Sequence, residues 1–197
     1  MRTLYLLRHG QTPATEGKIF CGATDVPLSA NGRRWLLELR DGGGYPALSG
    51  CRVVTSGMKR TEETLAVLYG AVAHDCDPRL REMNFGRFEM QTFEQLDTLP
   101  EFQAWLNDAY GKAICPGGEN SEMMQRRVNA AIEELLQQET RDTLVVTHGG
   151  PISFLMNRWF PGQREHLFAW QPQFGRGYAL TVAGTRVTAY RELPQTP

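Results

Sequence analysis

The sequence predicts an α/β fold in three layers, with a mainly parallel central sheet and helices on both faces. Short apolar runs alternate along the chain with segments of helical length, which is the pattern of consecutive β-α units. Two of these runs end in a histidine followed by glycine, at His9-Gly10 and at His148-Gly149. Ligands of open α/β sheets bind outside the carboxyl ends of the strands, so each histidine is expected where a reacting group would lie.

Four strands of this sheet are expected near residues 3–7, 52–55, 72–75 and 143–147. The first and last of them are nearly continuous apolar runs, which is typical of strands that are buried on both faces. Near the C-terminus, residues 178–182 and 186–190 flank Gly184 and predict a hairpin at an edge of the sheet.

Helices are expected near residues 31–40, 58–69 and 122–138. The last helix carries one apolar stripe that is expected to pack in the core, formed by Met124, Val128, Ala131, Ile132 and Leu135. Residues 92–110 predict a helical insertion that is interrupted at Pro100. No linker, repeat or low-complexity segment divides the chain, so residues 1–197 are interpreted as a single domain.

The composition is that of an ordinary globular protein. Of the 197 residues, 41% are hydrophobic and 22% are charged, and the formal net charge is −1. That charge gives no reason to expect nucleic acid or a membrane as a partner. The chain enters its first strand without a leader-like segment, so we expect a cytoplasmic protein. The cysteines are scattered without a Cys-x-x-Cys pair, which predicts free thiols and no metal site; they are Cys21, Cys51, Cys76 and Cys115.

The first candidate functional motif is Arg8-His9-Gly10. A cation, an imidazole and a glycine follow directly on a buried apolar run. The functional interpretation makes His9 a reacting group at the end of the strand. The alternative interpretation makes it a histidine that caps the strand by bonding to the backbone.

The second candidate motif is His148-Gly149-Gly150-Pro151. Proline is common in the first turn of a helix, and apolar residues continue a helical pattern through Trp159, so His148 is expected just before a helix N-terminus. Free N–H groups and the helix dipole favour a phosphate at such an end. The alternative is that the glycines merely form a tight turn between strand and helix.

Two charged residues complete the candidate set. Arg60 falls in the first turn of the helix expected near residues 58–69, where a cation opposes the helix dipole and an anionic ligand would explain its position. Glu82 stands among apolar neighbours in the run Arg-Glu-Met-Asn-Phe-Gly. The alternative for both residues is an ordinary solvated side chain.

Together these segments resemble the histidine phosphatase superfamily, also called the phosphoglycerate mutase-like family. The resemblance extends from Leu4 to about Leu155. It rests on the run Arg-His-Gly-Gln-Thr at 8 to 12, the pattern Ser-Gly-x-x-Arg-x-x-Glu-Thr at 56 to 64, Glu82, and the run His-Gly-Gly at 148 to 150. It implies a phosphoglycerate mutase-like fold, with the insertion near residues 92–110 over the active site. It also implies an enzyme that hydrolyses phosphoric monoesters.

The resemblance further implies roles for single residues. His9 would be the nucleophile that forms a phosphohistidine, and Glu82 would protonate the leaving oxygen and then accept a proton from water. The phosphoryl oxygens would be surrounded by Arg8, Arg60 and His148. Substrate binding would involve Arg8, Gln11, Thr15, Arg60 and Gly149. No metal or other cofactor is expected, the partner is a small-molecule phosphate monoester, and the oligomeric state is left open.

A narrower likeness is to the α-ribazole phosphatases of cobalamin biosynthesis. It rests on residues 82–90, on the run Ala-Trp-Leu-Asn-Asp at 104 to 108, and on Gly22 followed by Pro-Leu-Ser at 27 to 29. One departure is Thr15, which stands where these proteins usually carry asparagine. A few aromatic residues are expected to be mostly core, with one or two candidates for stacking on a benzimidazole ring; they are Phe85, Phe88, Phe93, Phe102 and Trp105. The alternatives are a broad sugar-phosphate phosphatase, a phosphoglycerate mutase and a non-catalytic phosphate-ligand binder.

Overall fold

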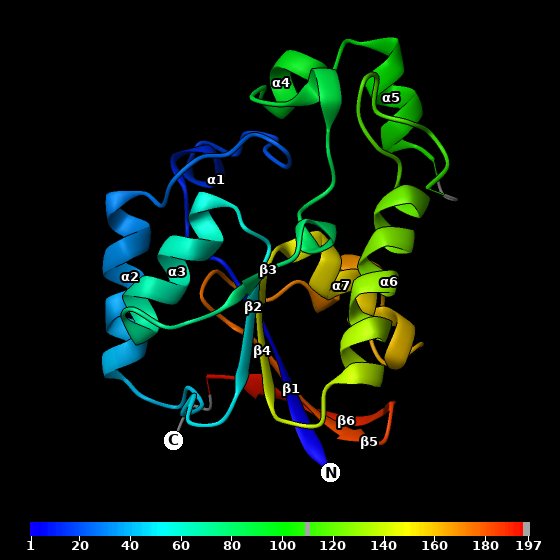
Figure 1. The fold of residues 1–197 in the computed structure, drawn as a ribbon. Helices are drawn as coiled ribbons and strands as arrows, with labels where there is room; N and C mark the ends of the chain where they lie inside the picture. The colour runs from blue at the N-terminus through cyan, green and yellow to red at the C-terminus, as the bar shows by residue number, and fades with distance from the viewer. Residues whose placement is uncertain (109–110, 195–197) are drawn as a thin grey trace.

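A six-stranded sheet forms the centre of the computed structural model, which describes residues 1–108 and 111–194 (Figure 1). The strand order is β3-β2-β4-β1-β5-β6. The strands are β1 (Arg2–Arg8), β2 (Arg52–Thr55), β3 (Asp75–Cys76), β4 (Thr143–Thr147), β5 (Gly177–Ala183) and β6 (Arg186–Leu193). The first four strands of that order are parallel to one another, whereas β5 pairs antiparallel with β1 and β6 pairs antiparallel with β5. This arrangement confirms the mainly parallel sheet and the C-terminal hairpin.

Helices cover both faces of the sheet, which confirms the three-layer prediction. On one side lie α2 (Ala30–Asp41) and α3 (Lys59–Tyr69), and on the other lie α6 (Ser121–Gln138) and α7 (Gly149–Trp159) (Figure 1). Successive residues of β1 show the division, because Leu6 belongs to the core cluster under α6 and α7 whereas Leu7 belongs to the cluster under α2 and α3. The apolar stripe of α6 is buried as expected.

The register of the two central strands places the candidate histidines side by side. β1 and β4 pair in parallel up to the match of Arg8 with Thr147. His9 directly follows β1 and His148 directly follows β4, so both residues leave the sheet at the same carboxyl edge. Their ring centroids lie 5.1 Å apart.

The strand expected near residues 72–75 is present, but it begins later in the chain than predicted. After α3 ends at Tyr69, the chain reaches the edge of β2 only at Asp75, which pairs with Val54. β3 is therefore the two-residue strand Asp75–Cys76, and residues 72–74 lie before it outside the sheet. An apolar run of this length does not say where an edge strand begins to pair.

The insertion consists of two short helices, α4 (Phe93–Leu96) and α5 (Pro100–Leu106), beyond the carboxyl ends of the parallel strands (Figure 1). Pro100 is the first residue of α5, where its missing N–H leaves no helical bond unmade. Residues 109–110, at the end of the expected insertion, lie outside the described residues. The short helices elsewhere are α1 (Pro13–Glu16) and the 3-10 helices Pro78–Leu80, Gly86–Phe88 and Leu167–Trp170.

The aromatic residues of the insertion and its surroundings are mostly packed. Phe88 and Phe102 are fully buried, and Phe85 and Trp105 pack against the same core cluster. Phe93 departs from the expectation, because its side chain is 46% exposed. Within residues 1–108 and 111–194, no helix is both long enough and apolar enough to cross a bilayer.

Candidate active site

His9 is buried and held in one tautomer. Its Nδ1 lies 2.6 Å from the carbonyl oxygen of Gly10. A carbonyl can only accept, so Nδ1 carries the proton and Nε2 carries the free lone pair. Burial, followed by the charges of Arg60 and Arg8, holds the pKa of His9 well below its ordinary value. The ring is therefore a neutral imidazole with an unprotonated Nε2 near neutral pH.

His148 is the N-cap residue of α7 and is fully buried. The Nε–H of Arg60 donates to its Nδ1 at 3.2 Å, so Nε2 carries the proton and donates to Ser56 Oγ at 2.8 Å. Both ring nitrogens thus have partners within the protein. Burial is the main cause that lowers the pKa of His148 well below the ordinary value, so this ring is neutral. The bond that Nδ1 accepts from Arg60 agrees with a neutral ring.

Arg60 lies in the first turn of α3 with only 1% of its surface exposed. Besides the bond to His148, Nη1 donates to Thr24 O at 2.9 Å and Nη2 donates to Gly22 O at 2.6 Å. Among the described residues, these partners use three of its five N–H groups. The two that remain leave Arg60 able to contact an anion without releasing the loop that it holds.

Arg8 is the last residue of β1 and is the less constrained of the two arginines. Its Nη1 donates to Pro172 O at 2.7 Å, and its guanidinium carbon lies 3.8 Å from the centre of the Phe174 ring. Its Nε is buried and has no hydrogen-bond partner among the described residues. Burial lowers the pKa of Arg8 to about 10, against the opposing charge of Glu82. An orphaned donor on a buried cation fits the oxygen of an anionic ligand.

Glu82 lies at the N-terminus of α7. Its Oε2 accepts from the N–H of Gly150 and its Oε1 accepts from the N–H of Met83, both at 2.9 Å. A Cβ at Gly150 would collide with Oε1, so glycine is required there for the carboxylate to approach. The carboxylate thus accepts from an N–H group in the first turn of α7, which has no partner within the helix.

The three other predicted binding residues, Gln11, Gly149 and Thr15, lie in different surroundings. Gln11 lines a cavity of about 460 Å³ together with Arg8 and Phe174. Gly149 opens α7, and a Cβ there would collide with the amide of Gln171. The hydroxyl of Thr15 is used inside α1, where it accepts from Thr12 N at 2.8 Å and donates to Thr12 O at 3.0 Å. A contact between Thr15 and substrate therefore stays a prediction.

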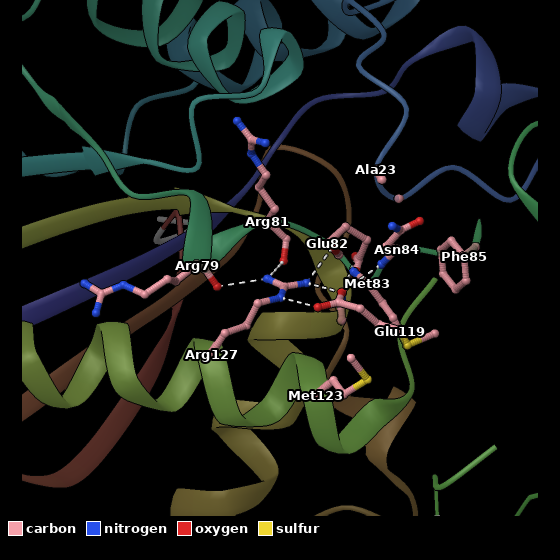
Figure 2. Close-up of polar contacts among 12 residues, drawn as sticks. Ala23, Arg79, Arg81, Glu82, Met83, Asn84, Phe85, Glu119, Met123 and Arg127 are labelled. Carbon is pink, nitrogen blue, oxygen red and sulfur yellow. Dashed lines mark hydrogen bonds and ion pairs between the residues drawn. The ribbon is translucent and has the colours of Figure 1, made fainter. Parts of the chain in front are cut away.

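Sequence reasoning missed the clamp that positions Glu82. Figure 2 shows Arg127 of α6 facing the segment before and after Glu82. Its guanidinium donates to Arg79 O at 2.9 Å, to Arg81 O at 2.6 Å and to Glu82 O at 2.8 Å. It also binds Glu119 Oε1 at 2.8 Å and Oε2 at 2.7 Å. All five of its N–H groups are thus engaged, and the backbone that carries Glu82 is tied to α6.

Glu89 forms a second clamp that sequence reasoning did not find. Its carboxylate accepts from the backbone N–H groups of Gly22, Ala23 and Thr24, at 2.8 to 3.1 Å. Arg60 donates to the carbonyls of Gly22 and Thr24 in the same loop. The loop at residues 22–24 is therefore fixed between a buried cation and a carboxylate, which supports the position of Arg60.

An apolar cavity of about 220 Å³ adjoins Glu82. Aromatic and sulfur-containing side chains dominate its wall, which includes Phe20, Met83, Phe85, Trp105, Met124 and Phe168. Trp105 comes from α5 in the insertion, so the insertion forms part of the wall. Glu82 therefore lies between this apolar cavity and the N-terminus of α7.

Two histidines, two arginines and a carboxylate thus gather at the carboxyl edge of the parallel strands, and comparison with known proteins identifies the family of the chain. The sequence model of the histidine phosphatase superfamily (branch 1) matches residues 4–189. The chain belongs to this superfamily, which confirms the expected phosphatase class. A curated relative is the probable phosphoglycerate mutase GpmB of Yersinia enterocolitica, with 30% identity over 80% of this chain and 74% of that protein.

Solved structures show a similar fold over nearly the whole chain. The structure named as the alpha-ribazole phosphatase from Shigella flexneri matches with a TM-score of 0.82 and 27% identity, over 94% of this chain and 93% of that one. A structure from Escherichia coli K-12, provisionally named as an alpha-ribazole-5'-P phosphatase, matches with a TM-score of 0.84 and 27% identity. That match covers 96% of this chain and 94% of the other. The resemblance inferred from the sequence is therefore confirmed.

Proposed function

We propose that this chain hydrolyses phosphate monoesters through a phosphohistidine formed at Nε2 of His9. The observation that carries the proposal is the bond from His9 Nδ1 to Gly10 O, 2.6 Å long, in a ring whose pKa is lowered by burial. The lone pair needed for attack on phosphorus is therefore available without prior deprotonation. Splitting hydrolysis into transfer to histidine and transfer to water replaces one difficult displacement by two easier ones.

The charged groups around His9 take the remaining roles in this proposal. Arg8 supplies its unpartnered Nε–H to the phosphoryl group, and Arg60 supplies its two unused N–H groups. Such charge-assisted bonds stabilise the charge on the transferring group. His148 supports Arg60 through the bond to Nδ1, and a direct contact of this ring with substrate stays a prediction.

Glu82 acts as the proton donor and acceptor. In its protonated form it gives a proton to the leaving oxygen, and as the carboxylate it takes a proton from the attacking water. The N–H groups of Gly150 and Met83 hold the carboxylate in place for the second step. The reaction requires no metal in this proposal.

The leaving group that we propose is the nucleoside-like alcohol of α-ribazole phosphate. The apolar cavity beside Glu82 suits a flat aromatic ring, and Phe85 and Trp105 in its wall can stack on one. The names of the solved structures from Shigella flexneri and Escherichia coli point to the same substrate. The name of the Yersinia enterocolitica relative supports a phosphoglycerate mutase as the second candidate. A phosphoglycerate is a small phosphorylated hydroxy acid, and its carboxylate would face the apolar wall of this cavity.

Two measurements test this function. The specificity constant is expected to be higher for α-ribazole phosphate than for 3-phosphoglycerate, and no phosphoryl transfer between phosphoglycerates is expected. His9→Ala is expected to abolish turnover while His166→Gln, at an exposed histidine, leaves it unchanged. Substantial phosphatase activity of His9→Ala would overturn the mechanism, and a preference for 3-phosphoglycerate would overturn the substrate while leaving the mechanism in place.

A further inference from the structure

Three potential metal ligands meet at the edge of the sheet, where β3 adjoins the first turn of α3. Glu62 lies in the first turn of α3, Cys76 lies in the edge strand β3, and His74 precedes that strand by one residue. One ligand atom from each lies within 4.8 Å of the other two. His74 and Cys76 are two residues apart in extended chain, so their side chains share one face.

The imidazole of His74 is oriented as a ligand would be. Its Nδ1 lies 2.8 Å from Val72 O, and a carbonyl only accepts, so this nitrogen carries a proton. Its Nε2 lies 2.6 Å from Glu62 Oε2. A bare lone pair facing a carboxylate at this distance is repulsive, so a proton lies between these two atoms, and a metal ion that bound the same nitrogen would displace it. Histidine ligands of metals commonly donate their other ring N–H to a backbone carbonyl in this manner.

Glu62 has no lysine or arginine to neutralise it among the described residues. Its hydrogen-bonding partners are His74, Thr55 and Cys76. The thiol of Cys76 lies 3.7 Å from Oε1 of Glu62, and Thr55 braces the same carboxylate oxygen. The side chains of Glu62 and His74 are 33% and 24% exposed, and Cys76 is exposed as well, so an ion could reach them from solvent.

We propose that Glu62, His74 and Cys76 bind a divalent cation of the Zn²⁺ type. Oxygen, nitrogen and sulfur ligands together are typical of zinc, with donor atoms roughly 3.3 to 3.6 Å apart in a tetrahedral site. Cys76 Sγ and Glu62 Oε1, 3.7 Å apart, are close to that spacing. His74 Nε2, 2.6 Å from Glu62 Oε2, has to move away from that oxygen to reach it. Binding displaces the proton between His74 and Glu62 together with the thiol proton of Cys76, and water completes the fourth position.

The site does not depend on the proposed reaction, because none of its ligands belongs to the phosphate-binding set. Its three residues lie 12 and 2 positions apart in the sequence, a spacing that differs from the common zinc motifs. Only the parallel pairing of β3 with β2, which sets Cys76 beside Thr55, brings the thiol to α3. The bound ion would tie the two-residue edge strand to the helix.

The test is titration of the chelator-stripped chain with Zn²⁺, by calorimetry and by competition with a chromophoric chelator. One ion per chain is expected, and Cys76→Ser and His74→Gln are each expected to weaken binding at least 10-fold. Cys51→Ser and His166→Gln serve as matched controls, because neither residue lies in the cluster, and both are expected to bind as the unaltered chain does. Circular dichroism of each metal-free variant establishes that it is folded.

Cobalt provides a second readout that a merely stabilising role of these residues would not give. The Co²⁺-loaded chain is expected to show a thiolate-to-cobalt charge-transfer band that is retained in Cys51→Ser and lost in Cys76→Ser. Binding of Zn²⁺ that is unchanged in both Cys76→Ser and His74→Gln would place the ion elsewhere and overturn the proposal. Absence of stoichiometric binding by the unaltered chain would show that the cluster holds only a proton.

Discussion

Replacing Arg127 by methionine is expected to destabilise the protein and to misplace Glu82. The substitution leaves three backbone carbonyls and the Glu119 carboxylate without the guanidinium that they share. Breaking a fully buried ion pair costs about 3 to 5 kcal/mol. The side chains of Arg127 and Glu119 are 21% and 18% exposed, so water compensates in part and we expect a loss of about 2 to 3 kcal/mol. In a domain of this size, that corresponds to a fall in Tm of roughly 4 to 12 °C.

The same substitution makes a prediction about pH. Burial raises the pKa of Glu119, but hydrogen bonds from Arg127 and from Asn84 N–H outweigh it, so the folded pKa lies below the ordinary value of 4.5. A carboxyl group whose pKa is lowered by folding stabilises the protein above its unfolded pKa and ceases to do so as pH falls through the folded pKa. The stability difference between the unaltered chain and Arg127→Met, measured by urea unfolding, is thus expected to be full above pH 4.5 and to shrink below it.

The catalytic consequence of Arg127→Met separates positioning from stability. A poor leaving group such as an alkoxide needs a proton from Glu82, so turnover of an alkyl phosphate is expected to fall at least 10-fold. An acidic phenol leaves without that proton, so phosphohistidine formation from its phosphate ester is expected to change little. Arg126→Met is the matched control, because Arg126 is an exposed neighbour on α6. Equal losses for both esters would refute the view that Arg127 acts through Glu82.

Three further outcomes are expected. Glu82→Gln should slow turnover of an alkyl phosphate by roughly 100-fold or more, whereas an aryl ester should show a burst followed by slow turnover in stopped-flow assays; equal losses in phosphohistidine formation from the two esters would show that another group donates the proton. Arg8→Ala and Arg60→Ala should each weaken competitive inhibition by inorganic phosphate about 10-fold or more, since each removes a charge-assisted contact; inhibition unchanged in both would remove the arginines from the phosphate site. Activity should persist in excess chelator in the unaltered chain and in Cys76→Ser alike, and its loss in both would mean that a metal other than the one proposed at Glu62, His74 and Cys76 takes part in the reaction.

The predictable part of the fold follows from periodicity and strand ends. β1 and β4 are continuous apolar runs because both their faces are covered, and the residues after such strands come together at one edge, so His9 and His148 could be paired from the sequence. The two-residue strand β3 could not be located in this way. Its position depends on where the chain meets β2, not on its own composition.

The clamps around the site were beyond sequence reasoning for a related reason. Arg127 and Glu89 act on backbone carbonyl and N–H groups, which every residue offers, so no pattern of residue types marks their targets. Arg127 lies 45 residues from Glu82, and Glu89 lies 67 residues from Gly22. The segment around Glu82 was singled out for its likeness to a family, but the partner that holds it comes from a helix with an otherwise ordinary charged face.

The most direct test of the account is to identify the atom of His9 that is phosphorylated. Single turnover of an aryl phosphate, quenched in alkali because phosphohistidine is labile to acid, would be followed by separation of the two phosphohistidine isomers. Because Nδ1 of His9 donates to Gly10 O, the account predicts phosphate on Nε2 alone. Phosphate on Nδ1, phosphate on a hydroxyl group, or the absence of any phosphoenzyme would contradict it.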